Sequence, residues 1–177
     1  MAHHRVWEEW MGDRVQTLED LLRPGLRVVC VGINPSPVSV EAGHYYQGTL
    51  GQRFFGRLRY VGLLDDRREG FEDDAAFASG VGFTDIVKRP TGNEAKVSVA
   101  EFEHGQNVLE AKLHAHRPQL VIFTFKKTAE ILFGSFVGNG FVPGLHLTNS
   151  EAFVMPAPFE SNTTVYPTLD TLAERLK

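Results

Sequence analysis

Asn34 is the first residue of the chain whose type and surroundings suggest chemistry. It follows the apolar run 28–31 and Gly32, and it precedes a Pro-Ser-Pro segment at 35–37. Proline ends a strand and restricts the residue before it to extended conformations, so we expect a rigid loop here. In that loop the Asn34 carboxamide can both donate and accept hydrogen bonds. A turn asparagine that bonds only its own backbone is the alternative interpretation.

Two further segments end in residues that could line a site. The segment 80–87 is expected to be a short strand that delivers Thr84 and Asp85, and the apolar segment 152–155 is stopped by Pro156. In open α/β sheets, ligands bind beyond the carboxyl ends of the strands. If their strands point the same way, the loops at Asn34 and Pro156 therefore flank one cleft.

The periodicity of the apolar residues predicts the elements that position these loops. Ser98 and Glu101 have the spacing of a capping box. We expect loops over 38–51 and 134–143, helices over 6–22, 54–63, 71–79, 98–116, 126–133 and 166–176, and strands over 26–31, 80–87, 120–125 and 152–155. Alternation of strands and helices predicts an α/β protein. The predicted fold is a three-layer αβα sandwich with a central, mostly parallel four- to five-stranded sheet, in a single domain over residues 1–177.

Length and composition restrict the class of protein. The 177 residues suit one domain with one substantial core. No apolar run approaches the length of a membrane span, and no apolar segment follows the N-terminus, so we expect a cytoplasmic protein without a secretory signal. Cys30 is the only cysteine, which excludes an internal disulfide, a thiolate zinc site and an iron–sulfur cluster within one chain.

The histidines show no metal-ligand spacing with acidic partners, so we expect neither a metal nor a cofactor. His3 and His4 could form a metal-binding pair, but we interpret them as part of a frayed terminus. The others are expected to be surface or helix-capping residues: His44, His104, His114, His116 and His146.

The net charge of −4 and the pI of about 6.0 are not those of a strong nonspecific nucleic-acid binder. Any contact with DNA must come from a local basic patch and from backbone N–H groups. An acidic run at 69–74 interrupts the candidate basic residues, which are Arg53, Arg57, Arg59, Arg67, Arg68, Lys88, Arg89 and Lys96.

Four short motifs occur in one order along the chain. They are Gly-Ile-Asn-Pro at 32–35, Gly-His-Tyr-Tyr at 43–46, Gly-Val-Gly-Phe-Thr at 80–84 and Val-Met-Pro at 154–156. Together they resemble the mismatch-specific uracil/thymine DNA glycosylases, a branch of the uracil-DNA glycosylase superfamily. The resemblance implies an enzyme, acting as a monomer, that removes uracil or another mismatched or damaged base from DNA. In that family a first active-site motif, here Gly-Ile-Asn-Pro at 32–35, holds the hydrolytic water and the base, and a second motif, here at 158–161 after Val-Met-Pro, inserts a wedge into DNA.

The resemblance gives roles to residues around the first motif. Asn34 holds the water through its carboxamide oxygen. Backbone N–H groups around Ile33 and Tyr46 face a pyrimidine oxygen and stabilise the departing anion. The Tyr46 ring stacks on the flipped base, although a half-buried core tyrosine is an equally open interpretation. Ser39 occupies a pocket position where the family carries a small residue.

Three more residues belong to the implied base pocket or water site. Asp85 stands where the family usually has Asn or Lys, and we expect its carboxylate to be a second water-activating group. An N-cap, or a salt bridge to Lys88 or Arg89, is the alternative for Asp85. Thr84 is expected in the base pocket, together with Gln52, which lies near the family's asparagine before Arg-Phe.

The second motif departs further from the family pattern. Phe159 keeps an apolar wedge, Ser161 replaces an arginine that can contact the orphaned partner base, and Glu160 adds negative charge near phosphates. Strict recognition of an opposite guanine is therefore not implied. The expected wedge loop comprises Pro156, Ala157, Pro158, Phe159 and Ser161.

These expectations favour a monofunctional glycosylase. No lysine is placed as a Schiff-base nucleophile, and Lys88 and Lys126 are interpreted as phosphate contacts. The alternative from another class is a non-catalytic nucleic-acid or nucleotide-binding domain with the same fold. A further alternative, an enzyme acting on free nucleosides, has no use for the Phe159 wedge.

Overall fold

A five-stranded sheet forms the centre of the computed structural model, which describes residues 3–65, 70–134, 137–143 and 149–177. Four strands run parallel and the short edge strand β6 runs antiparallel to β7, which confirms the predicted α/β fold with a mostly parallel sheet. The strand order is β4-β3-β5-β7-β6, with bounds β3 Val28–Gly32, β4 Val81–Asp85, β5 Leu120–Phe123, β6 Gly140–Phe141 and β7 Glu151–Val154.

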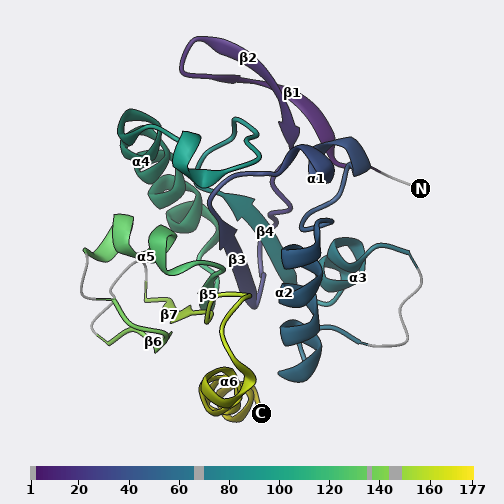
Figure 1. Cartoon of the computed structure of the whole chain (residues 1–177), viewed down its shortest axis with the longest axis vertical. Coiled ribbons are helices and arrows are strands. Elements are labelled where there is room, and N and C mark those ends of the chain that lie inside the picture. Colours follow the sequence, from purple (N-terminus) through teal and green to yellow (C-terminus); the bar gives the residue numbers. More distant parts are fainter. Residues whose placement is uncertain (1–2, 66–69, 135–136, 144–148) are drawn as a thin grey trace.

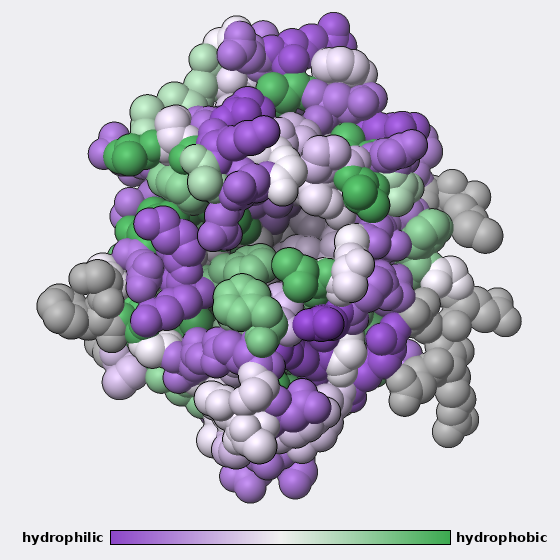
Figure 2. All heavy atoms as spheres, viewed as in Figure 1, coloured by the Kyte–Doolittle hydropathy of each residue, from purple (hydrophilic) through white to green (hydrophobic). Residues whose placement is uncertain are grey.

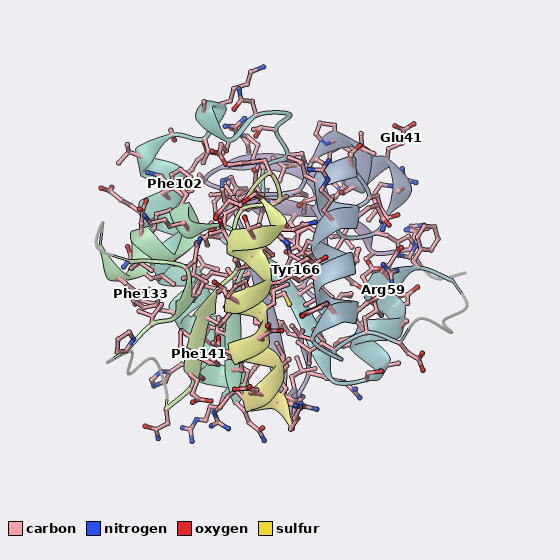
Figure 3. The ribbon with its side chains drawn as sticks, turned by 60° about the horizontal axis from the view of Figure 1, so that its bottom comes forward. Glu41, Arg59, Phe102, Phe133, Phe141 and Tyr166 are labelled. Atoms are coloured by element: carbon pink, nitrogen blue, oxygen red, sulfur yellow. The ribbon has the colours of Figure 1, made fainter. Side chains whose placement is uncertain are left out.

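Helices cover both faces of the sheet and complete three layers (Figure 1). One face carries α1 Pro37–Ala42, α2 Thr49–Tyr60, α3 Glu72–Ala78 and α6 Asn162–Leu176, and the other carries α4 Val99–His116 and α5 Lys126–Phe133. A short 3₁₀ turn, η1 Glu94–Lys96, precedes α4. Figure 3 shows α6 beside α2, with Tyr166 directed into the gap between them. In the described parts of the chain, no helix is long and apolar enough to cross a membrane.

The central strand β3 explains where a site can form. Its residues are all buried, and alternate side chains enter opposite cores: Val28 and Cys30 face α2, whereas Val29 and Val31 face α4. β4 pairs with one edge of β3 and β5 with the other. The carboxyl end of β3 is therefore the point where the strand order reverses, and the loops there diverge to opposite sides.

The predicted helix over 6–22 is wrong. Residues there form an antiparallel hairpin of β1 Arg5–Trp10 and β2 Asp13–Leu18, in which Trp10 pairs with Asp13. Met11 and Gly12 both have positive φ, the backbone of a two-residue hairpin turn that matches strand twist. The apolar residues lie close enough to helical spacing to favour a helix, whereas the Met-Gly turn is the sequence signal of the hairpin.

Three smaller differences concern loops and a boundary. Helix α1 lies within the expected loop 38–51, because Ser36 caps it and Pro37 occupies its first turn. Strand β6 lies within the expected loop 134–143, and α6 begins at Asn162 rather than at 166. The other predicted helices and strands are present with shifts of a few residues, and the Ser98–Glu101 capping box is confirmed.

Helix α4 packs directly on the end of β4 through Gly105. A Cβ atom at this position would overlap the carbonyl oxygen of Ile86, which is backbone and cannot turn away. We expect Gly105→Ala to lower the free energy of unfolding by about 1–3 kcal/mol, measured by urea denaturation. Gly56→Ala is the matched control, because Gly56 is exposed on α2 and no atom outside the neighbouring turns of that helix lies within 4 Å of its added Cβ. It should stabilise the protein by about 0.5–1 kcal/mol; equal effects of the two substitutions would contradict this packing.

Candidate active site

A cavity of about 320 Å³ lies at the carboxyl ends of β3 and β4. Figure 2 shows the surface hollowed near the centre of this face, with hydrophobic and hydrophilic side chains side by side around the hollow. The volume suits one small ligand held by mixed apolar and polar contacts. Of the expected site residues, the cavity wall contains Ile33, Asn34, Ser39, Tyr46, Asp85 and Pro158.

Asn34 is held in one orientation by the loop that follows β4. Its side-chain amide nitrogen donates to the backbone oxygen of Arg89 at 2.9 Å and to the hydroxyl oxygen of Thr91 at 2.8 Å. Both amide hydrogens are thus used, and no described residue donates to its carboxamide oxygen. This oxygen is a positioned acceptor, and Asn34 is not the self-bonded turn residue of the alternative interpretation.

Asp85 fills the space that a side chain at position 32 would occupy. Gly32 and Asp85 are partners in the parallel pair β3–β4, and a Cβ on Gly32 would overlap the Asp85 carboxylate and lie 3.0 Å from the Tyr46 hydroxyl. Asp85 Oδ1 and Tyr46 Oη are both buried without a hydrogen-bond partner among the described residues. Unsatisfied buried polar groups are costly, so their presence in a cavity wall points to a ligand or water that they bind.

Burial raises the pKa of Asp85 to about 7. Lys88 and Lys112 oppose this rise, and Asp20 adds to it, although none of the three forms an ion pair with Asp85 in the described structure. The alternatives for Asp85, an N-cap or a salt bridge to Lys88 or Arg89, are therefore not observed. A carboxylate with a pKa near neutrality can accept a proton at physiological pH.

Lys88 belongs to a buried ionic cluster rather than to the surface. Its ammonium donates to the backbone oxygen of Leu18 and lies 3.0 Å from Asp20, which also contacts Lys112 at 2.6 Å. The expected phosphate contact at Lys88 is therefore wrong. Thr84 joins the same cluster, donating to Asp20 at 2.7 Å, and it is not in the cavity wall as expected.

Tyr46 has a strained backbone with a φ of 55°, which is uncommon for a residue with a side chain. Its ring is half-buried, makes edge-to-face contacts with Phe54 and Phe55, and lines the cavity. Gln52 lies outside the cavity wall and donates to the backbone oxygen of Tyr46 at 3.3 Å. Gln52 therefore acts on the pocket by holding Tyr46 and does not face a ligand.

Ser39 is buried in α1 and joins the two loops that border the cavity. Its hydroxyl oxygen accepts hydrogen bonds from the Ser36 hydroxyl at 3.0 Å and from the Gln47 backbone N–H at 3.1 Å. Ile33 is also buried, and its backbone oxygen accepts from Val87 at 2.8 Å. These bonds fix the shape of the pocket wall.

The loop after β7 is held rigidly from the side of α2. The Arg57 guanidinium donates to the backbone oxygens of Pro156 and Ala157, the second at 2.8 Å, and Arg53 donates to that of Pro158 at 3.2 Å. A loop with two prolines and three anchored carbonyls loses little entropy when it binds a partner.

Phe159 lies at the tip of this loop with 74% of its surface exposed. Phe159 therefore does not fold back onto the core. Glu160 turns inward, accepting from the Ala157 backbone N–H at 2.7 Å and from the Asn139 side chain at 3.1 Å. Ser161 is exposed and stands at the N-terminus of α6.

Several of the basic residues expected to contact DNA instead contact acidic residues of the protein. Arg89 makes a two-point contact with Glu101 at 2.7 and 2.8 Å, and Arg59 lies 3.5 Å from Glu72. Lys126 lies 3.7 Å from Glu130 but stays half-exposed. Arg67 and Arg68 lie outside the described residues. Arg53 and Arg57 are the arginines that bring positive charge to the wedge loop.

Two functional neighbours were missed from the sequence. Thr91 orients Asn34, and Arg57 anchors the wedge loop. The Arg-Pro-Thr segment at 89–91 resembled a simple turn, and Arg57 was considered only as a DNA contact. No local pattern could have revealed either role, because each partner is more than 50 residues away.

His4 and His44 are not where the sequence suggested. His4 is buried and not part of a frayed terminus, and its backbone N–H donates to the Gly43 oxygen at 2.8 Å. His44 is 1% exposed and lies 2.9 Å from Asp73, so it is neither a surface nor a helix-capping residue.

A cavity at the carboxyl ends of parallel strands, with a buried carboxylate of raised pKa in its wall, is the usual place and composition of a ligand or active site in an α/β protein. The sequence profile of the Uracil DNA glycosylase superfamily matches residues 19–176. The chain therefore belongs to the Uracil DNA glycosylase superfamily, as its motifs predicted. Membership implies a DNA glycosylase, a hydrolase whose substrate is DNA.

The raised pKa of Asp85 has a consequence for stability that can be measured without substrate. The unfolded chain ionises Asp85 near pH 4, whereas the folded protein resists ionisation up to about pH 7, so this residue destabilises the fold increasingly between these values. Asp85→Asn should therefore raise the free energy of unfolding at pH 8, by at most about 4 kcal/mol, and the gain should vanish near pH 4.

Asp13→Asn is the control for this measurement, because Asp13 is exposed in the hairpin. Thermal unfolding from pH 4 to pH 8 should show no pH-dependent gain for it. A gain for Asp85→Asn that stays constant across the range would contradict a folded-state carboxyl that titrates near neutrality.

Proposed function

We propose that the protein is a monofunctional glycosylase that hydrolyses the N-glycosidic bond of uracil, and of other mismatched or damaged pyrimidines, in DNA. The carrying observation is the Asp85 carboxylate, buried without a partner in the wall of the same cavity as the oriented Asn34. The four motifs further support assignment to the mismatch-specific branch of the superfamily.

The proposed reaction needs a positioned water and a stabilised leaving group. Water attacks C1′ of the sugar, the bond from C1′ to the base breaks, and the base leaves with the bonding electron pair. The Asn34 carboxamide oxygen orients this water but is a poor proton acceptor. The ionised Asp85 carboxylate, whose pKa is about 7, stabilises the positive charge that develops on the sugar and then takes the proton of the attacking water.

The base pocket is proposed to recognise a pyrimidine by stacking and by backbone donors. Tyr46 offers an aromatic face, and backbone N–H groups near Ile33 and Tyr46 are directed at a carbonyl oxygen of the base. Ser39, being small, leaves room for the ring. Gln52 and Thr84 lie outside the cavity wall and act on it indirectly. Gln52 hydrogen-bonds to the backbone of Tyr46, and Thr84 hydrogen-bonds to Asp20.

The activity is tested by incubating the protein with labelled duplexes that carry a single uracil opposite guanine. We expect release of uracil and an abasic site that breaks only after alkali, because no lysine is proposed as a Schiff-base nucleophile. EDTA should not reduce this activity. If stoichiometric protein releases no uracil from single- or double-stranded DNA but still binds it, the non-catalytic binding domain becomes the better explanation.

The second prediction concerns Asn34, which is proposed to orient the water, and Asp85, which is proposed to take its proton. Asn34→Ala and Asp85→Ala should each reduce the single-turnover rate by about 10²–10⁴-fold but leave measurable activity, and the double variant should be nearly inactive. The wild-type rate should rise with pH up to about 7 and then level off, because only ionised Asp85 accepts a proton. Full activity in Asp85→Ala would limit Asp85 to a structural role.

The wedge is proposed to be Phe159, supported by its exposure on an anchored loop. A large apolar side chain can fill the gap that a flipped nucleotide leaves and so offset an unstacking cost of a few kcal/mol. This cost is greatest in a fully paired duplex and nearly absent in a single strand.

Phe159→Ala should therefore slow uracil removal most from a U·A duplex, less from U·G and least from single-stranded DNA. The melting temperature should not change, because the side chain has no core contacts to lose. Trp7→Ala, which removes another exposed aromatic side chain from the β1–β2 hairpin, is the control and should leave all three rates unchanged. An equal loss on all three substrates would remove the wedge from the mechanism.

A further inference from the structure

Four potential metal ligands converge on the side of the molecule where the N-terminal segment meets α3. The imidazoles of His4 and His44 and the carboxylates of Asp73 and Asp74 each place one ligating atom within 4.8 Å of all the others. They come from three separate parts of the chain: the segment before β1, the loop after α1, and the first turn of α3. His4, His44 and Asp73 are buried, so the cluster is built into the fold.

The distances show how the four groups face one another. His4 Nε2 lies 2.7 Å from Asp74 Oδ1, and His44 Nδ1 lies 2.9 Å from Asp73 Oδ1. The other Asp74 oxygen lies 3.9 Å from His44 Nδ1, so this carboxylate stands between the two rings. Two nitrogen and two oxygen donors thus surround one small volume.

We propose that this cluster binds a divalent transition-metal ion, with zinc as the best match. Two neutral imidazoles and two carboxylates form a four-donor set of the kind that zinc accepts in tetrahedral sites. Such a set would be neutral overall with a divalent ion, which suits a buried position. Magnesium and calcium prefer sites made of oxygen donors alone.

Groups outside the cluster that contact the proposed ligands support this proposal, because they restrict how the ligands are oriented. The second ring nitrogen of His4, Nδ1, lies 3.3 Å from Glu19, and a proton shared there leaves the Nε2 lone pair free for a metal. The second oxygen of Asp73 accepts the Tyr45 backbone N–H at 2.8 Å. Oδ1 accepts the Asp74 backbone N–H at 3.0 Å with one lone pair and keeps the other, on the side of His44, for coordination. The His44 ring is stacked on Phe71 with centroids 3.6 Å apart, so its direction is also restricted.

The proposed metal would be structural. None of the four ligands lines the cavity, but His44 directly precedes Tyr45 and Tyr46, which do. A metal would therefore fasten the N-terminal segment and α3 to the loop that carries the strained Tyr46. The alternative is a pair of His–Asp ion pairs, which needs no metal and has no specific affinity for one.

Zinc titration of the chelator-treated full-length protein distinguishes a zinc site from two metal-free His–Asp ion pairs. The readout is competition for zinc against a chromophoric chelator. We expect one zinc ion per chain, bound at micromolar or lower dissociation constant, and a melting temperature raised by about 5 °C or more at saturating zinc. Magnesium should have no effect. Uracil release at a temperature far below melting should not depend on zinc, which separates this test from that of the proposed activity.

Two conservative variants test the assignment of ligands. His4→Gln and Asp74→Asn should each weaken zinc binding at least tenfold and abolish the zinc-dependent rise in melting temperature. His114→Gln removes an exposed histidine from α4 and should bind zinc like the wild type. Circular dichroism establishes that each variant is folded. Absence of stoichiometric binding by the wild type, or binding unchanged in both ligand variants, would overturn the proposal in favour of simple ion pairs.

Discussion

The close approach of Asp85 to the backbone of Gly32 is the contact on which the site depends. A parallel register places these two residues opposite each other, and only a residue without Cβ leaves room there for the carboxylate and for the Tyr46 hydroxyl. The carboxylate is thereby removed from water, and its pKa rises to about 7 because burial disfavours the ionised form. The same burial that destabilises the fold makes this carboxyl group a suitable proton acceptor, which is a common compromise at active sites.

The rest of the site is rigid because its loops are bonded to one another across the sheet. Asn34 after β3 is held by the loop after β4, and the loop after β7 is held by the arginines of α2. Each of these bonds runs from a side chain to a group far away in the chain, so neither loop can move without losing them. Such preorganisation reduces the reorganisation that catalysis would otherwise require.

Elements defined by a strong local pattern were predicted correctly, and elements defined by pairing were not. The apolar strands and the capped helix α4 have signals contained in a few neighbouring residues. The hairpin β1–β2 was mistaken for a helix because its apolar residues lie near helical spacing, and the Met11-Gly12 turn that pairs Trp10 with Asp13 distinguishes the two structures. Strand β6 has two residues and exists only because β7 offers it an edge.

The sequence alone determined the α/β class, the two proline-bearing loops, the superfamily and the presence of Asn34 and Asp85 at strand ends, because each is encoded in contiguous residues. Tertiary structure decided which of the expected site residues reach the cavity. Lys88 and Thr84 turn into the Asp20 cluster, Gln52 acts through Tyr46, and Phe159 stays exposed. It also decided that His4 and His44 meet Asp73 and Asp74. The direction of a side chain depends on strand register and on partners far away in the chain, and no short stretch of sequence contains that information.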